Sequence, residues 1–141
     1  MEELHTKKKT LTLYSLFGVL VGVFVVQYFF RAPGLDKQLL NAASEINKTC
    51  PVMIDQETRL DNTFSTSKSD FRYNYTLVNR SKEEIDVAAL ENYIKPPLIK
   101  NIRTNPEMSL FRNNEITLTY TYKDKNGTFV LSLPIKPEEY K

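Results

Sequence analysis

Residues 115–135 read EITLTYTYKDKNGTFVLSLPI and hold the clearest folding signal in the chain. Before the turn, four side chains alternate with threonines and share one strand face: Ile116, Leu118, Tyr120 and Tyr122. Asn126-Gly127 is the pair that two-residue hairpin turns favour. After the turn we expect four side chains to face the core, namely Phe129, Leu131, Leu133 and Ile135. Pro134 predicts an edge strand or a strand end, so the stretch is an antiparallel hairpin with one buried face.

An earlier segment repeats this pattern and predicts a second hairpin. Its first strand is expected to turn Leu60, Asn62 and Phe64 to one side, and residues 67–70 make the turn. Its second strand places four large side chains on one face: Phe71, Tyr73, Tyr75 and Leu77.

Each hairpin follows a stretch of helical periodicity. Residues 35–48 carry an apolar stripe, and Pro51 lies just beyond their end. A second helix follows Ser81, with Ser81 or Asp86 as its cap and an apolar stripe that includes Leu90 and Ile94. Pro96-Pro97 is expected to kink or interrupt this helix.

The order of these segments predicts an α+β domain of αββαββ type. The simplest architecture is a four-stranded antiparallel sheet with both helices on one face. The opposite face would carry threonine, asparagine and arginine side chains and lie open to solvent or to a partner.

Ahead of this domain lies an uncharged run of twenty residues, LTLYSLFGVLVGVFVVQYFF at 11–30. A helix of this length spans the roughly 30 Å hydrocarbon core of a bilayer. Lys7, Lys8 and Lys9 precede it, which favours a cytoplasmic N-terminus and an exported C-terminal domain. The competing interpretation is a cleaved signal peptide, but the run is long for one and no small-residue cleavage site follows.

The expected organisation is therefore a cytoplasmic tail (1–10), a transmembrane helix that serves as an uncleaved signal anchor (11–30), a linker (31–34) and an extracytoplasmic domain (35–141). The lipid bilayer is the first expected partner, and the inner membrane of the cell is the expected location. Gly18 and Gly22 match the GxxxG spacing that lets spans pack closely, so they are candidate residues for homodimerisation; simple span composition explains them equally well.

Charge and composition exclude several classes of function. Of 19 Lys+Arg and 17 Asp+Glu in the whole chain, four bases and two acids precede residue 32, which leaves fifteen of each sign in the domain. This balance argues against nucleic-acid binding. His5 is the only histidine, so the domain has no histidine base and no histidine zinc ligand. Cys50 is the only cysteine, and we expect it to be buried. No cofactor, metal site or enzymatic activity is expected, although carboxylate-only catalysis stays open.

The densest group of charges lies at DQETRLD, residues 55–61. In an extended chain Asp55, Glu57, Arg59 and Asp61 would share one face and could bind a cation or a basic partner. A solvated strand face with mutually compensating charges is the simpler interpretation.

The run EINKTCPVMIDQETRLDNT (45–63), with YNYTL (73–77) and KNIRTNPEM (100–108), resembles a group of small membrane-anchored bacterial envelope proteins of uncharacterised function. In that group the run reads Ile-Asn-Lys, a Cys or Leu, Pro, and then an Asp-x-Glu-Thr-Arg-Leu-Asp segment. The resemblance implies no activity. It does imply a shared structural or binding feature at Asp55, Glu57, Thr58, Arg59 and Asp61.

Together these observations predict a non-catalytic, single-pass envelope protein whose exported domain binds a protein partner or serves as an accessory subunit of a complex. The polar sheet face, the acidic segment and an edge strand at 131–135 are the candidate contact surfaces. One alternative is a small-ligand or glycan-binding module, in which Tyr73, Tyr75, Tyr120 and Tyr122 would line a pocket instead of filling a core. The third is a carboxylate-dependent hydrolase.

Overall fold

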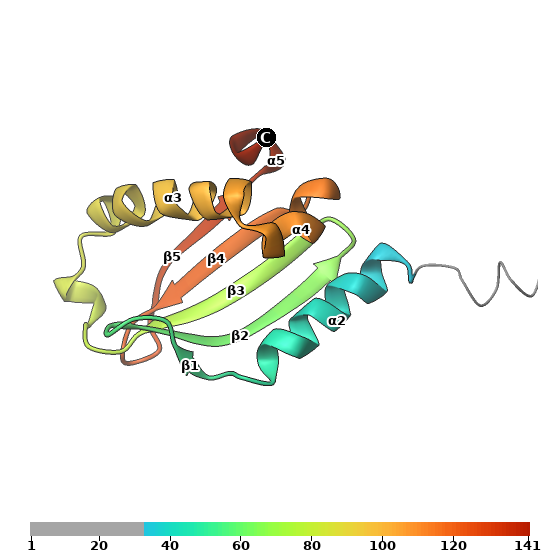
Figure 1. Cartoon of the computed structure of the whole chain (residues 1–141). Coiled ribbons are helices and arrows are strands. Elements are labelled where there is room, and N and C mark those ends of the chain that lie inside the picture. The colour runs from blue at the N-terminus through green and yellow to red at the C-terminus, as the bar shows by residue number, and fades with distance from the viewer. Residues whose placement is uncertain (1–32) are drawn as a thin grey trace, which may run out of the picture. The chain divides into compact units, whose positions relative to one another are not determined.

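The centre of the fold is a pair of parallel strands, β3 (Asp70–Leu77) and β4 (Thr117–Lys123), in a computed structural model that describes residues 33–141. β2 (Thr58–Ser67) flanks β3, β5 (Phe129–Ile135) flanks β4, and the two-residue β1 (Val52–Met53) pairs with β2. The order is β1-β2-β3-β4-β5, and every pair except β3–β4 is antiparallel (Figure 1).

The expected four-stranded antiparallel sheet is therefore wrong, because the sheet is five-stranded and mixed. β1 was missed since two residues leave no alternating pattern. The direction of β4 follows from the connection: α3 (Val87–Thr104) carries the chain back along the sheet before β4 begins, so β4 runs the same way as β3. Alternation predicts which face a side chain occupies, but it does not predict the direction of the neighbouring strand.

Residues 33–141 contain four α-helices where two were expected. Besides α3 they are α2 (Leu35–Asn47), the short α4 (Ser109–Asn113) and α5 (Pro137–Tyr140). α3 runs through Pro96 and Pro97 as one helix, so of the expected kink or interruption the interruption does not occur. Both prolines are exposed, as are Asn92 and Tyr93 four residues before them, so water can bond the carbonyls that lose an N–H partner.

The core occupies one face of the sheet, here called the inner face. α2 packs against β2 and α3 packs near β5, and Figure 1 shows the middle strands between the two helices. The strands contribute Phe71, Leu118, Leu133 and Ile135, which are 0–3% exposed. The helices add Leu39 and Ile102, both fully buried. The inward alternation predicted for β3 and β4 is thus confirmed.

Two irregularities in the strands change which side chains are buried. The β2–β3 register shifts between Leu60 and Asn62, so Leu60 and Thr63 face the core while Asn62 and Phe64 do not. The β4–β5 register shifts beside Lys123, so Val130 is buried and Phe129 is 51% exposed. The prediction that Leu60, Asn62 and Phe64 share one side is therefore wrong, as is the inward position of Phe129, because a bulge reverses the alternation locally.

Three polar side chains hold elements together. The Asn47 side chain pairs with the Thr63 backbone: its Nδ2 donates to Thr63 O (2.8 Å), and its Oδ1 accepts from Thr63 N (2.7 Å). The Tyr140 hydroxyl donates to Ile116 O (2.6 Å), with a longer contact of 3.5 Å to Phe111 O. The third is the Asp124 carboxylate, which accepts from the backbone N–H groups of Lys82, Asn126 and Thr128.

The Asp124 bonds close the β4–β5 turn, in which Gly127 has φ +81°, a conformation that glycine adopts readily. The strands are joined by residues 124–128, a longer loop than the two-residue turn that Asn126-Gly127 predicted. Burial raises the pKa of Asp124, but the three amide hydrogen bonds outweigh it and hold the pKa below its ordinary value. The carboxylate is therefore ionised at neutral pH and anchors both the turn and the segment before α3.

Within residues 33–141 no helix is long and apolar enough to cross a membrane. The predicted span at 11–30, with Gly18 and Gly22, lies outside the described residues. The tail and span boundaries thus stay predictions.

Candidate functional site

A groove of about 700 Å³ opens on the inner face, between the middle of the sheet, α3 and the connection from β1 to β2. Its wall from α3 is apolar and includes Leu90, Ile94, Pro97 and Leu98. Its other wall is formed by residues 54–58. Met108, the residue directly before α4, also lines the groove. This volume falls within the range of roughly 300–1,000 Å³ that is typical of ligand-binding pockets.

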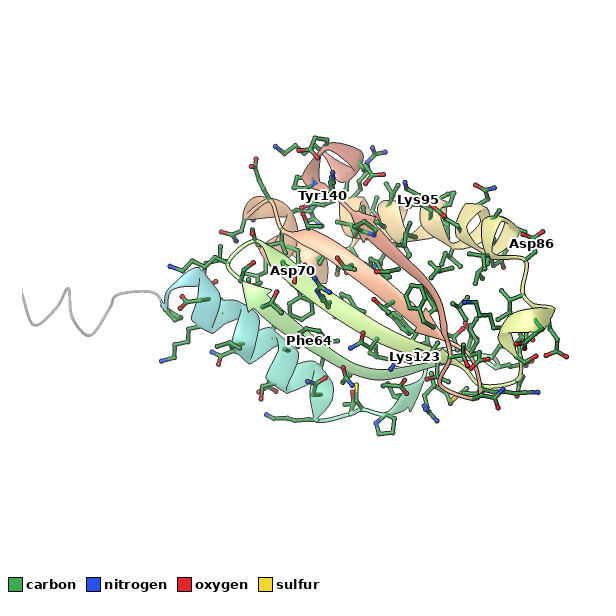
Figure 2. The ribbon with its side chains drawn as sticks, turned by 180° about the vertical axis from the view of Figure 1, so that it is seen from behind. Phe64, Asp70, Asp86, Lys95, Lys123 and Tyr140 are labelled. Carbon is green, nitrogen blue, oxygen red and sulfur yellow. The ribbon has the colours of Figure 1, made fainter. Side chains whose placement is uncertain are left out.

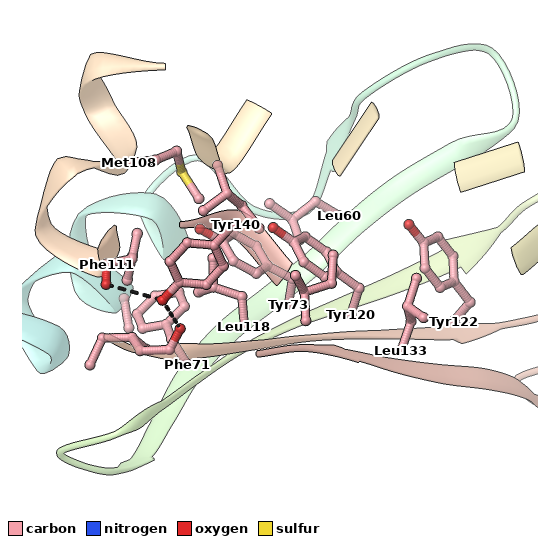
Figure 3. Close-up of a cluster of buried hydrophobic side chains, with 14 of the residues drawn as sticks. Leu60, Phe71, Tyr73, Met108, Phe111, Leu118, Tyr120, Tyr122, Leu133 and Tyr140 are labelled. Atoms are coloured by element: carbon pink, nitrogen blue, oxygen red, sulfur yellow. Dashed lines mark hydrogen bonds between the residues drawn. The ribbon is translucent and has the colours of Figure 1, made fainter. Parts of the chain in front are cut away.

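Four tyrosines form the floor of the groove. The parallel register places Tyr73 beside Tyr120 and Tyr75 beside Tyr122. The rings of the first pair are stacked with centroids 5.1 Å apart and planes 6° from parallel, and those of the second pair are 5.0 Å apart at 16°. The alternation of β3 and β4 therefore builds a two-by-two array of stacked rings, which we call the tyrosine floor. Figure 3 shows three of these tyrosines beside the core.

The hydroxyl groups of the tyrosine floor have no hydrogen-bond partner among residues 33–141. Tyr73, Tyr120 and Tyr122 are only 8%, 3% and 6% exposed. No fully enclosed side-chain oxygen in the described part of the chain lacks a partner, so these hydroxyl oxygens must reach the groove. Burial, and then the charge of Asp55, raises the pKa of Tyr122 to about 12. Burial likewise raises the pKa of the other three, and all four hydroxyls are neutral donors at pH 7.

Two large apolar side chains stand exposed at the edges of the groove. Tyr93 on α3 is 80% exposed, and Ile54 in the β1–β2 connection is 57% exposed. Both line the groove although they gain little burial from the domain itself. Exposed apolar side chains gathered around a hollow are typical of a binding surface.

Asp55 shapes the wall of the groove opposite α3. Its Oδ1 accepts hydrogen bonds from the backbone N–H groups of Glu57 and Thr58, each at 2.8 Å. These bonds fold residues 55–58 into a tight turn. The Glu57 amide contributes most to lowering the pKa of Asp55, partial burial opposes it, and the Thr58 amide adds to the lowering. Asp55 is therefore charged at neutral pH. Glu57 forms an exposed ion pair with Arg80 at 3.3 Å.

The structure divides the residues singled out in the sequence into two groups. Asp55, Glu57 and Thr58 all line the groove. Arg59 and Asp61 are elsewhere: Arg59 Nε lies 2.6 Å from Asp61 Oδ1, and Asp61 Oδ2 accepts from the Thr76 hydroxyl at 2.6 Å. Since Leu60 between them is buried, Arg59 belongs to the opposite face of the sheet. The turn at Asp55 breaks the extended geometry that would have aligned all four charges.

That opposite, outer face is polar, as expected. Figure 2 shows it from behind, with Phe64 and Lys123 labelled. Asn62 and Asn74 are joined by a side-chain hydrogen bond of 2.7 Å, and the Arg72 guanidinium lies 5.9 Å from the centre of the Phe64 ring. A pocket of about 210 Å³ lies there, and the side chains of Asp61, Asn62, Asn74 and Thr121 in its lining are already hydrogen-bonded to other residues of the face. The outer face therefore has less free bonding capacity than the groove.

Metal-binding and thiol chemistry find no support in the described part of the chain. Residues 33–141 contain no group of three histidine, cysteine or acidic side chains placed to hold a metal ion. Cys50 is half-buried, and its Sγ lies 3.5 Å from Ile46 O. Burial, with a smaller contribution from Asp61, raises the pKa of Cys50, so the thiol is protonated and poorly nucleophilic at neutral pH.

The fold and the groove define a class, an α+β domain that carries a ligand-sized groove on the inner face of one mixed sheet. Residues 34–131, well over half of the chain, match the family described as "Domain of unknown function (DUF8479)", and the chain belongs to that family. A comparison with curated proteins finds no matching sequence.

Solved structures share the fold. A protein from Pseudomonas aeruginosa described as a presumed secreted protein has a TM-score of 0.64 at 14% identity, over 76% of this chain and 93% of that one. The pilotin of the Vibrio vulnificus type 2 secretion system has 0.60 at 8%, over 76% and 92%. The type II secretion system pilotin of Vibrio cholerae has 0.54 at 10%, over 74% and 91%. These similarities establish the fold.

Proposed function

We propose that this protein is a non-catalytic subunit of the bacterial cell envelope that binds a segment of a protein partner in the groove. The observation that carries the proposal is the tyrosine floor: its hydroxyls reach the groove and bond no described residue, while exposed Ile54 and Tyr93 flank the opening. Exposed apolar surface is costly in water, and the hydroxyls offer donors to a ligand, so a bound segment would cover the first and bond the second.

Two further findings support an accessory role in the envelope. Pilotins of two type II secretion systems have this fold, and the third similar structure is described as a presumed secreted protein. The sequence resembles envelope proteins in the run at 45–63. Because the identities are 14% or less, the similarity supports a class of role and names no partner for this chain.

A small-ligand or glycan-binding module is the second candidate. It is favoured by the same volume of about 700 Å³ and by the stacked rings, since flat aromatic faces also bind sugars and apolar small molecules. The groove lies between α3 and residues 54–58 and is flanked by the exposed apolar side chains Ile54 and Tyr93, which favours a peptide segment over a small polar ligand.

The test is affinity capture of the tagged full-length protein from its native envelope, followed by mass spectrometry of what co-elutes. Tyr93→Glu places a carboxylate at the edge of the groove without disturbing the core, because Tyr93 is 80% exposed. Ala88→Glu is the matched control, because it adds the same charge to the exposed surface of α3 outside the groove.

We expect a stoichiometric protein partner with the unmodified chain and with Ala88→Glu, and its loss with Tyr93→Glu. Recovery of the chain alone would overturn the proposal. A partner that is retained equally by all three proteins would show that the groove does not bind it.

A further inference from the structure

The charged side chains that line the groove are all of one sign. Asp55 and Glu57 are its only charged lining residues, and no lysine, arginine or histidine from residues 33–141 lines it. Arg80 lies outside the lining and pairs with Glu57 across 3.3 Å, with both side chains about half exposed. Exposed pairs of this kind are weak and exchange readily with solvent, so the wall at residues 54–58 keeps a negative character.

The Asp55 carboxylate is held in place at the wall of the groove. Its Oδ1 accepts hydrogen bonds from the amides of Glu57 and Thr58, and the Thr58 side chain also bonds the carboxylate. The backbone turn fixes the direction of the carboxylate before any ligand arrives. A preorganised acceptor of this kind binds a cationic donor without the full entropic cost of ordering it.

The tyrosine floor points independently to a ligand. Tyr73, Tyr120 and Tyr122 are more than nine-tenths buried, and their hydroxyls reach the groove without a partner in the described chain. A bound segment must therefore offer hydrogen-bonding groups as well as apolar surface. Asp55 lies close enough to Tyr122 to raise the pKa of that hydroxyl, so the acidic wall and the floor act on the same end of the groove.

We propose that the groove selects a protein segment that lays apolar side chains over the tyrosine floor and places a lysine or arginine against Asp55 and Glu57. This inference rests on the proposed function and adds the chemistry of the partner. The segment's polar groups accept hydrogen bonds from the floor, and Ile54 and Tyr93 pack against its sides. Its cation donates hydrogen bonds to the carboxylates of the acidic wall and neutralises their charge. Asp55 and Glu57 are the specificity-determining residues of the site.

The test uses random peptides displayed on phage and selected against the full-length chain in lipid nanodiscs, so that detergent does not enter the groove. Peptides retained by the unmodified chain but not by Tyr93→Glu are taken as groove ligands. The dissociation constant of a recovered peptide is then measured, together with that of its version in which the basic residue is replaced by glutamine.

Three substitutions isolate the charge. Asp55→Asn keeps an Oδ1 that can still cap the turn, and Glu57→Gln keeps the side-chain shape. Glu83→Gln is the matched control, because Glu83 is exposed and lies outside the groove, and its substitution removes an equal charge. Thermal unfolding of each variant confirms that the domain remains folded.

We expect groove-dependent peptides to combine an apolar run with a lysine or arginine. Asp55→Asn and Glu57→Gln should each weaken their binding about threefold, and the loss should increase at low ionic strength. Glutamine in the peptide should weaken binding similarly, and the charge variants should then have no further effect. Glu83→Gln should leave the affinity unchanged.

Groove-dependent peptides without a basic residue, or with affinities that Asp55→Asn does not change, would overturn this inference and leave the proposed function standing. Failure to recover any groove-dependent peptide would overturn it together with the peptide-binding function. These two outcomes separate the chemistry of the ligand from the existence of the site.

Discussion

At the scale of single residues, tyrosines of similar burial have different roles. Tyr140 is 2% exposed and donates a 2.6 Å hydrogen bond to Ile116 O. Tyr120 is 3% exposed, and its hydroxyl has no partner among residues 33–141. A buried hydroxyl that is bonded contributes to folding, whereas one that faces a groove is available for binding.

The first prediction compares the loss of these two hydroxyls. Tyr140→Phe leaves the buried Ile116 carbonyl without its donor and should lower the free energy of unfolding by about 1–2 kcal/mol. Tyr120→Phe removes no internal hydrogen bond, so its effect should stay within about 0.5 kcal/mol. Urea unfolding measures both. An equal loss of stability in the two variants would contradict the assignment of Tyr120 to the groove.

The same contrast shows what the sequence can reveal about the site. Alternation predicts that Tyr73, Tyr75, Tyr120 and Tyr122 share the inner face, and the structure confirms it. Alternation cannot say whether a helix covers them fully, because that depends on where α3 crosses the sheet. The spacing of these tyrosines with apolar neighbours favoured a place in the core, and the structure puts them in or against the core while they also line the groove. Tyr93 was missed since it falls beside the apolar stripe of its helix rather than within it.

At the scale of elements, the β2 edge is paired partly by the very short strand β1 and partly by an asparagine side chain. β1 pairs only with Leu60 and Arg59, which leaves the rest of the β2 edge unpaired by any strand of residues 33–141. Further along that edge, Asn47 at the end of α2 bonds both the N–H and the C=O of Thr63. The Asn47 amide thus substitutes for a neighbouring strand at one residue and fixes α2 on the sheet.

The second prediction follows from this contact. Asn47→Ala leaves two backbone groups of a residue that is 2% exposed without partners, and it should lower the free energy of unfolding by about 2–3 kcal/mol. Asn47→Asp keeps the acceptor for Thr63 N but loses the donor, so it should be less stable than the native chain. Lys48→Ala, which loses only an exposed ion pair, is the control. If Asn47→Ala unfolds like Lys48→Ala, the contact has no energetic role.

The elements themselves were largely predictable, and their arrangement was not. The two long helices and the strands that form both hairpins lie where periodicity and turn residues indicated. The parallel β3–β4 pairing depends on where α3 returns the chain, and the inward turn of Val130 depends on one extra residue in β5. Neither feature can be predicted from the local pattern of apolar and polar residues.

At the scale of the whole molecule, ionisable groups define the pH range of the fold. Four carboxyl groups have a pKa below the ordinary value because of hydrogen bonds in the folded state: Asp55, Glu84, Asp124 and Glu139. Their contribution to stability is present above the unfolded pKa, ordinarily 3.8 for Asp and 4.5 for Glu, and is lost as pH falls through the folded pKa. The buried tyrosines of the floor act in the opposite direction: their raised pKa makes the fold less stable as pH rises.

The third prediction is therefore a plateau of stability with two flanks. The melting temperature should be nearly constant in the neutral range and should fall at pH values below about 4 as these carboxylates protonate. It should fall again as pH rises above 10.0, the ordinary tyrosine pKa, because the unfolded chain ionises tyrosines that the fold keeps neutral. Asp124→Asn should reduce the acid flank. Melting temperatures that do not change between neutral pH and pH 3 would contradict the carboxylate assignments.

The composition of the tyrosine floor has an optical consequence. The chain contains no tryptophan, so its intrinsic ultraviolet emission comes from its eight tyrosines. Five of them line the groove: Tyr73, Tyr75, Tyr93, Tyr120 and Tyr122. A segment that enters the groove displaces water from these phenol rings, and a tryptophan carried by that segment would receive their excitation energy. The protein thus carries a built-in fluorescent reporter of groove occupancy, which needs no label.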